Sequence, residues 1–182
     1  VRALVRERAG GRRFVNLFAY TGTASVYAAA GGATAVHTVD LSATYVEWAQ
    51  RNMALNGLAE RPGVRFFRTD ALAWLAEERR RVEVGVADPY GLVFCDPPTF
   101  STSKRMGERT FDVQRDHVAL IRDAAALLAA DGELVFSTNL RTFTLDADAL
   151  GDLRVEDITA ATIPPDFART PKIHRCFVIR QS

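Results

Sequence analysis

The chain has 182 residues, of which 48% are hydrophobic and 25% are charged, and its formal net charge is +1. This size and composition suit a single globular domain over residues 1–182. Because the net charge is close to zero, it gives no indication of a nucleic-acid partner. No apolar run approaches the ~20 residues that span a bilayer. Cys95 and Cys176 supply no disulfide framework, and no export signal opens the chain. We therefore expect a cytoplasmic protein without a membrane segment.

Strand and helix signals alternate along the chain, with apolar runs of strand length separated by segments of helical composition. The residues up to Gly10-Gly11 read as a helix entered part-way, so we expect a C-terminal fragment of a longer protein. In chain order the pattern then predicts strand 13–19, helix 23–30, strand 35–39, helix 43–56, strand 64–68, helix 71–81, strand 90–95, an irregular loop 96–110, helix 112–129, strand 132–137, a short helix 146–150, and strands 155–159 and 173–179.

This alternation predicts an α/β fold with a mostly parallel sheet and helices on both faces. Ligands of such sheets bind beyond the carboxyl ends of the strands, where the strand order reverses. The expected strand ends carry polar or acidic residues at Tyr20, Asp40, Asp70, Asp96 and Asn139. The sequence therefore predicts a binding crevice at this edge of the sheet.

The turn after the first strand indicates which cofactor this crevice takes. Residues 16–23 contain one glycine, Gly22, whereas a dinucleotide fingerprint needs three so that the backbone can approach a pyrophosphate. A smaller cofactor without phosphate fits better, and S-adenosylmethionine is such a cofactor. Its amino acid end would meet the turn, for which we expect contacts from Phe18, Tyr20, Thr21 and Gly22.

Two further carboxylates suit a nucleoside. Asp40 ends the second strand, where a carboxylate can accept hydrogens from both ribose hydroxyls. A capping role for Asp40 is the weaker alternative, because Ser42 already serves as helix cap. Asp70 ends the third strand and can accept from the adenine amino group, although capping the next helix is a strong alternative and the two roles can coexist. We add Ser42 and Ala71 to the expected cofactor contacts.

Asp96-Pro97-Pro98-Thr99-Phe100 follows the apolar run Leu92-Val93-Phe94-Cys95. Two prolines end the strand and hold the backbone extended. An acid and an aromatic on such a rigid loop suit a flat, hydrogen-bonding substrate, so Asp96, Pro97, Pro98 and Phe100 are the expected catalytic residues, with Asp96 also near the cofactor. The pattern resembles the substrate loop of methyltransferases that modify nitrogen atoms of nucleic-acid bases.

Basic residues near this loop are candidates for RNA contacts, with a solvated loop as the equal alternative. The candidates are Lys104, Arg105, Arg109 and Arg115. Phe100 could stack on an extruded base. His37, His117 and His174 show no ligand spacing with the cysteines, so no metal is expected. Tyr45 and Trp48 are assigned to packing.

The acceptor atom follows from the cysteines. Methylation of a pyrimidine carbon needs a cysteine nucleophile. Cys95 should point away from the face of Asp96, Cys176 lies in a terminal strand, and Ser137 stands where related carbon methyltransferases keep a Ser-Cys pair. Nitrogen is therefore favoured, above all guanine N7, whose lone pair needs no deprotonation; an exocyclic amine stays open. A cytosine-C5 methyltransferase and a non-catalytic RNA-binding module are the alternative functions.

Several segments together resemble one family, the guanine-N7 methyltransferase half (RlmK) of the bifunctional bacterial 23S rRNA methyltransferase RlmK/L. They are residues 16–25, 39–42, 96–106, 111–117, 166–169 and 173–174. The most specific are the Lys-Arg-Met motif at 104–106 and the Phe-Asp-Val-Gln-Arg motif at 111–115.

The resemblance implies a seven-stranded, Rossmann-like class I fold, S-adenosylmethionine as cofactor, and 23S rRNA as substrate and partner in rRNA processing. It also implies upstream RNA-binding and guanine-N2 methyltransferase parts. By position, Tyr20, Thr21 and Gly22 would contact the methionine part of the cofactor. Asp40 would contact the ribose, Asp70 the adenine, and 96–100 the base.

Overall fold

The computed structural model of the protein describes residues 1–102, 110–163 and 173–182. Its elements follow one another in this order: α1 Arg2–Arg8, β1 Arg13–Leu17, α2 Thr23–Ala30, β2 Ala35–Asp40, α3 Ala43–Leu55, β3 Val64–Arg68, α4 Ala71–Glu83, β4 Tyr90–Cys95, β5 Phe100–Thr102, β6 Thr110–Asp112, α5 Val113–Ala125, β7 Leu128–Thr138, the 3-10 helix η2 Asp148–Leu150, β8 Leu153–Asp157, α6 Thr159–Thr162 and β9 Arg175–Gln181.

Seven strands form one sheet in the order β3-β2-β1-β4-β7-β9-β8. The pairs from β3 to β7 are parallel, whereas β9 runs antiparallel to both of its neighbours. The order reverses between β1 and β4, where a doubly wound sheet opens a crevice. The predicted fold, a mostly parallel seven-stranded α/β sheet, is confirmed.

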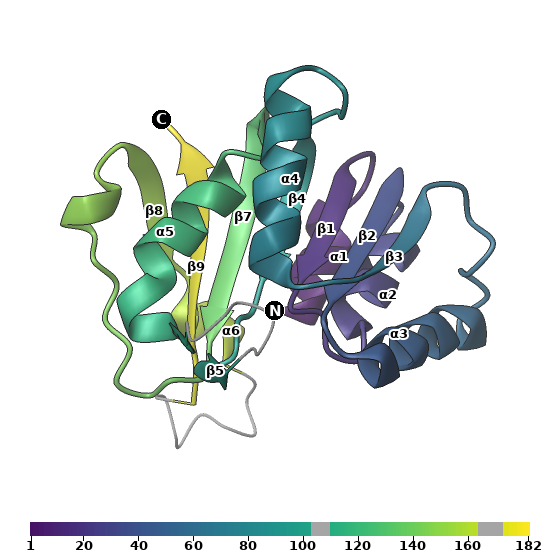
Figure 1. Cartoon of the computed structure of the whole chain (residues 1–182), viewed down its shortest axis with the longest axis horizontal. Coiled ribbons are helices and arrows are strands. Elements are labelled where there is room, and N and C mark those ends of the chain that lie inside the picture. Colours follow the sequence, from purple (N-terminus) through teal and green to yellow (C-terminus); the bar gives the residue numbers. More distant parts are fainter. Residues whose placement is uncertain (103–109, 164–172) are drawn as a thin grey trace.

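Helices cover both faces of the sheet, which explains why its central strands are apolar runs. One core holds Trp74 of α4 and Ile121 of α5. The opposite core holds Val5 of α1, Ala28 of α2 and Met53 of α3. In Figure 1, α4 and α5 lie in front of the sheet, and α1 and α2 lie behind it. No helix in the described ranges is long and apolar enough to cross a membrane.

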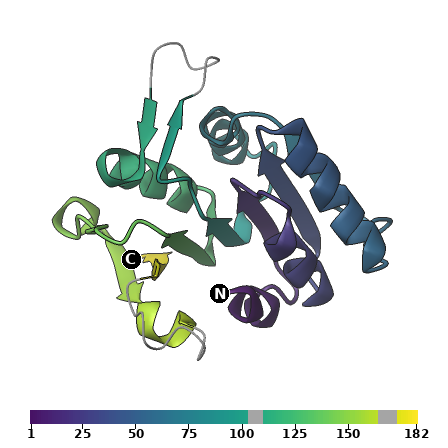
Figure 2. The same ribbon diagram turned by 90° about the horizontal axis from the view of Figure 1, so that it is seen from below.

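Several predicted elements differ from the structure in their bounds, and three of the differences have a clear physical reason. The helix expected at 112–129 ends at Ala125, because Leu128 pairs with Tyr90 and begins β7. The strand expected at 155–159 ends at Asp157, whose Oδ1 accepts from Thr159 N at 2.9 Å as α6 begins. The segment 96–110 is not wholly irregular, since β5 and β6 pair as an antiparallel hairpin. Figure 2 shows this hairpin, in teal, standing away from the sheet beside α5.

A buried polar network ties α4 to the sheet. Tyr90 Oη donates to Glu78 Oε1 at 2.7 Å and lies 2.7 Å from His37 Nδ1, so it accepts from that nitrogen. Arg81 pairs with Glu78 at 2.9 Å, and the Arg13 guanidinium lies 4.7 Å from the centre of the Tyr90 ring. The buried carboxylate is thereby paired and hydrogen-bonded, as an interior charge requires.

We expect His37 to make folding stability depend on pH. Burial, and then the charges of Arg13, Arg65 and Arg81, lower the pKa of His37 from 6.5 to about 4. Between these values the unfolded chain binds the proton and the folded protein does not, so stability falls as pH decreases. At pH ~5 the loss relative to pH ~7 should reach ~2 kcal/mol. Urea unfolding of the protein and of His37→Gln at both pH values measures it. An equal pH dependence in both proteins would contradict this role of His37.

Candidate functional site

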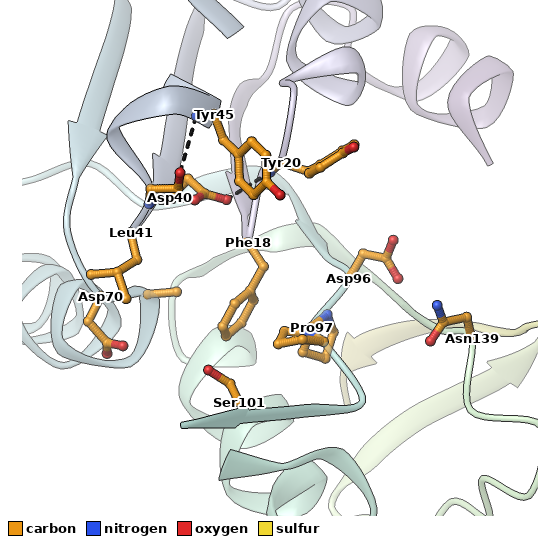
Figure 3. Close-up of a pocket in the computed structure, with 13 residues that line it drawn as sticks. Phe18, Tyr20, Asp40, Leu41, Tyr45, Asp70, Asp96, Pro97, Ser101 and Asn139 are labelled. Atoms are coloured by element: carbon orange, nitrogen blue, oxygen red, sulfur yellow. Dashed lines mark hydrogen bonds between the residues drawn. The ribbon is translucent and has the colours of Figure 1, made fainter. Parts of the chain in front are cut away.

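The carboxyl ends of β1 to β4 surround a cavity of about 600 Å³ in the described part of the chain. Its polar wall includes the carboxylates Asp40, Asp70 and Asp96, which come from three different strands (Figure 3). The remaining lining residues are Phe18, Tyr20, Leu41, Ser42, Tyr45, Ala71, Pro97, Pro98, Ser101 and Asn139. A volume of this size accommodates a small organic cofactor.

Asp40 joins two loops of the cavity. Its Oδ2 accepts from Tyr20 N, and its Oδ1 accepts from Ser42 N, each at 2.8 Å. Ser42 in turn caps α3 by accepting from Tyr45 N at 3.4 Å. A carboxylate oxygen has two acceptor directions, so each oxygen of Asp40 keeps one for a ligand.

Asp70 is the N-cap of α4, and its Oδ1 accepts from Leu72 N and Ala73 N at 3.0 Å each. The capping role is therefore confirmed. Because both of these bonds go to Oδ1, Oδ2 keeps its acceptor capacity, and Asp70 lines the cavity. The two roles expected of Asp70 are geometrically compatible.

The turn from β1 into α2 has a strained backbone, and side chains from β2 and α3 hold it in place. Phe18 and Tyr20 have positive φ angles of 55° and 51°, a conformation that costs non-glycine residues free energy. Asp40 holds the turn at Tyr20 N, and Asn52 Nδ2 donates to Thr21 O at 2.8 Å. The strain places the side chains of Phe18 and Tyr20 on the cavity wall.

Gly22 is required by packing as well as by backbone conformation. Its φ is 69°, and a Cβ at this position would lie 2.4 Å from Ala49 Cβ on α3. Thr21 and Gly22 line neither this cavity nor the second one described below. Their contacts with a cofactor stay predictions, and the single glycine of the turn has a structural reason independent of any ligand.

A second cavity of about 330 Å³ adjoins the first. Asn16 and His174 line it, and so do Phe18, Tyr20, Asp96 and Asn139, which line the first cavity as well. Asn16 is buried, with its Nδ2 donating to Ser25 Oγ at 3.1 Å and its Oδ1 without a partner among the described residues. The two cavities therefore meet at the ends of β1, β4 and β7.

Asp96 lies at this junction. Its Oδ1 accepts from Ser137 Oγ at 2.6 Å. The protein around the carboxyl removes part of its hydration and raises its pKa, while the Ser137 hydrogen bond and nearby His174 lower it and offset part of the shift. Asp96 is nevertheless exposed to solvent.

Hydrogen bonds fix the loop after Asp96 to the segment that follows β7 and to the start of α5. Thr99 Oγ1 donates to Asn139 Oδ1 at 3.0 Å, and Val113 N donates to Thr99 O at 3.1 Å. Pro97 and Pro98 line the cavity as expected. Phe100 is 56% exposed and is not among the lining residues, so stacking on a base stays a prediction.

The predicted RNA contacts divide into two groups. Lys104, Arg105 and Arg109 lie outside the described residues. Arg115 bonds to both carboxylate oxygens of Asp116, at 2.8 and 2.7 Å, and also donates to Thr110 O at the base of the hairpin. Its charge thus already has a partner within the protein, and contact with RNA stays a prediction.

Neither cysteine reaches the site. Cys95 and Cys176 are both fully buried in the cores, and neither lines either cavity. Burial raises the pKa of the Cys95 thiol well above its ordinary value and that of Cys176 to about 11. A thiolate nucleophile is therefore disfavoured at both positions.

The histidines and acids form no metal site within the described ranges. His117 is buried on α5, where its Nδ1 lies 2.9 Å from Gln114 O and its Nε2 accepts from Asp146 N at 3.1 Å. The Nδ1 nitrogen therefore donates to that carbonyl. His117 is therefore a packing residue.

Sequence reasoning missed four contributors. Tyr45 lines the cavity and meets Tyr20 in an edge contact at 4.5 Å, although it was assigned to packing. Leu41 and Ser101 also line it, and Ser137 anchors Asp96. Tyr45 had a signal, because an aromatic one turn into a helix faces the preceding strand end. The partnership of Ser137 and Asp96 had none.

The chain resembles known methyltransferases over nearly its whole length. The family described as S-adenosylmethionine-dependent methyltransferase matches residues 1–163. The "Ribosomal RNA large subunit methyltransferase K/L" of Methylococcus capsulatus is 52% identical over 180 residues, covering 98% of this chain and 23% of that protein. The protein of the same name from Allochromatium vinosum is 50% identical over 183 residues, covering 99% and 23%. The chain thus spans about a quarter of these relatives' length.

Solved structures share the fold. The methyltransferase SMU.776, crystallised with SAH, superposes with a TM-score of 0.80 at 25% identity, covering 98% of this chain and 47% of that one. TrmN from Thermus thermophilus superposes with a TM-score of 0.63 at 19% identity, covering 99% of this chain and 48% of that one. At 19% identity, the likeness to TrmN shows a shared fold and nothing more.

We expect Gly22→Ala to destabilise the protein by more than backbone strain alone. Gly57 has nearly the same φ, 67°, but nothing lies within 4 Å of a Cβ added there. Gly57→Ala should therefore cost ~1 kcal/mol, and Gly22→Ala at least ~2 kcal/mol more, because Ala49 blocks the new methyl group. Urea unfolding of both variants measures the difference. Equal losses would refute the packing role, whereas partial recovery in Gly22→Ala with Ala49→Gly would support it.

Proposed function

The chain belongs to the S-adenosylmethionine-dependent methyltransferases, and we propose that it methylates N7 of a guanine in the 23S rRNA of the large ribosomal subunit. The observation that carries this proposal is Asp96 on its Pro-Pro loop, at the junction of two cavities that contain no cysteine. The relatives named above as large-subunit rRNA methyltransferases support the choice of rRNA.

The first cavity suits the cofactor of this family. Asp40 would hold the ribose hydroxyls, because both of its oxygens are already oriented by backbone N–H groups. Asp70 would accept from the adenine amino group, with Leu41 and Ala71 as apolar walls and Ser42 beside them. Phe18 and Tyr20, with Thr21 and Gly22 behind them, would lie along the methionine part. When bound, S-adenosylmethionine supplies an electrophilic methyl group on a positively charged sulfur.

A ring nitrogen is the acceptor that these residues can serve. Guanine N7 carries an in-plane lone pair and needs no base to remove a proton, only alignment. Methylation leaves the purine positively charged, and the Asp96 carboxylate stabilises charge that develops next to it. Pro97 and Pro98 hold Asp96 in place, and Phe100 would stack on the base. Attack by a pyrimidine carbon has no comparable support, because both thiols lie in the cores.

The parent protein would supply more of the RNA-binding surface. Since the chain spans about a quarter of its relatives, we propose that RNA-binding and second methyltransferase parts are linked to it in the full-length protein. Lys104, Arg105, Arg109 and Arg115 would contribute phosphate contacts from this domain. Arg115 lies beside the base of the β5–β6 hairpin, and the other three residues lie outside the described ranges.

Asp40→Ala should lower the affinity for S-adenosylhomocysteine at least ~10-fold, because hydrogen bonds to a charged acceptor contribute ~1.5–3 kcal/mol. Isothermal titration calorimetry on the full-length parent measures this. Asp131→Ala is the matched control, since Asp131 is 82% exposed and lies outside both cavities. Thermal unfolding of each variant shows whether loss of the Tyr20 and Ser42 bonds has unfolded the turn. Unchanged affinity in folded Asp40→Ala would refute the ribose role.

Labelled methyl transfer to protein-free 23S rRNA, followed by nucleoside identification, tests the reaction. We expect 7-methylguanosine from the full-length parent. Asp96→Asn, which can still accept from Ser137, should lower kcat ~100-fold and leave the Kd of S-adenosylhomocysteine within about threefold. Appearance of 5-methylcytosine, or no transfer at all, would overturn the proposed function.

A further inference from the structure

Asp96 and Asn139 are two planar polar side chains that line both cavities. They follow β4 and β7, which pair in parallel at the centre of the sheet. Figure 3 shows them side by side, with the amide nitrogen of Asn139 turned toward Asp96. From the sequence, Asn139 is predicted only as one of the polar strand ends.

Each of the two side chains is held by a hydroxyl on one oxygen. Ser137 Oγ donates to Asp96 Oδ1 at 2.6 Å, and Thr99 Oγ1 donates to Asn139 Oδ1 at 3.0 Å. Asp96 therefore presents Oδ2 as an acceptor. Asn139 presents the two hydrogens of Nδ2, which donate to no residue in the described part of the chain. The pair offers a fixed acceptor beside a fixed donor.

We propose that Asn139 and Asp96 select guanine, with Asn139 Nδ2 donating to O6 and Asp96 Oδ2 accepting from N1–H. This inference rests on the proposed function and names the residue that chooses the base. Guanine carries its O6 acceptor and N1–H donor on adjacent ring atoms, which complements the pair. Adenine carries the reverse, an amino donor at position 6 and a lone pair at N1, so both contacts would be repulsive.

The same contacts agree with transfer to N7. N7 lies on the other side of O6 from N1, so neither contact covers its lone pair. Methylation makes the ring cationic and N1–H a stronger donor, so the bond to the Asp96 carboxylate strengthens as the reaction proceeds. Asn139 is thus a specificity-determining residue, and Thr99 is a positioning residue that acts through it.

Base-substituted RNA separates selectivity from overall activity. The substrate is a synthetic RNA fragment that carries the target guanine. In two further versions of this fragment, inosine or 2,6-diaminopurine replaces that guanine. Inosine keeps O6 and N1–H, whereas 2,6-diaminopurine keeps N7 but reverses positions 1 and 6. The full-length parent should prefer guanine over 2,6-diaminopurine at least ~100-fold in kcat/KM and treat inosine within about tenfold of guanine.

Variants of Asn139 should change this ratio. Asn139→Asp should lower the guanine to 2,6-diaminopurine ratio ~100-fold, because a second carboxylate repels O6 and accepts from the 6-amino group. Thr99→Val keeps Asn139 but releases its amide, and should lower the ratio ~10-fold. Asn56→Asp makes the same chemical change at an exposed position outside both cavities and should leave the ratio unchanged.

Two results would overturn the inference while leaving the proposed function intact. One is a ratio unchanged in both Asn139→Asp and Thr99→Val. The other is a loss of S-adenosylhomocysteine affinity beyond about threefold in Asn139→Ala, because Asn139 would then contact the cofactor rather than the base. If the unaltered parent transfers no methyl group to the guanine-bearing RNA, the proposed function fails and the inference fails with it.

Discussion

Parallel pairing of β3, β2, β1, β4 and β7 brings the carboxyl ends of five strands to one edge of the sheet. Asp40, Asp70, Asp96 and Asn139 depend on this register, because each one ends its strand or follows it within two residues. The helices that return between these strands pack on both faces and leave that edge to the loops. The crevice therefore lies where the strand order reverses, between β1 and β4.

The site residues serve the fold with one part of the side chain and leave another part free for ligands. Asp40 orients the Tyr20 and Ser42 backbone, and Asp70 caps α4 through one oxygen only. Asp96 and Asn139 are each held by a hydroxyl. Such bonds fix the direction of the remaining acceptors and donors before any ligand arrives, so little side-chain ordering is left to binding.

Burial assigns the chemistry as much as the polar groups do. Both thiols lie in the cores and have raised pKa values. The charged group at the junction of the two cavities is instead the carboxylate of Asp96. A carboxylate beside an aligned purine favours an acceptor that already has a lone pair. The resemblance to large-subunit rRNA methyltransferases and this distribution of side chains lead to the same proposed reaction.

Local patterns in the chain predicted the alternation of strands and helices, the caps Ser42 and Asp70, and the acids at the strand ends, because periodicity and capping are local properties. The place of Leu128 in β7 and the pairing of β5 with β6 depend on long-range contacts and became evident in the folded protein. The same holds for the close contact between Gly22 and Ala49, which leaves no room for a Cβ at position 22. It also holds for the hydrogen bonds by which Ser137 and Thr99 orient Asp96 and Asn139. The two hydroxyl bonds join residues 41 and 40 positions apart, and no local pattern records which distant side chains a parallel sheet will bring together.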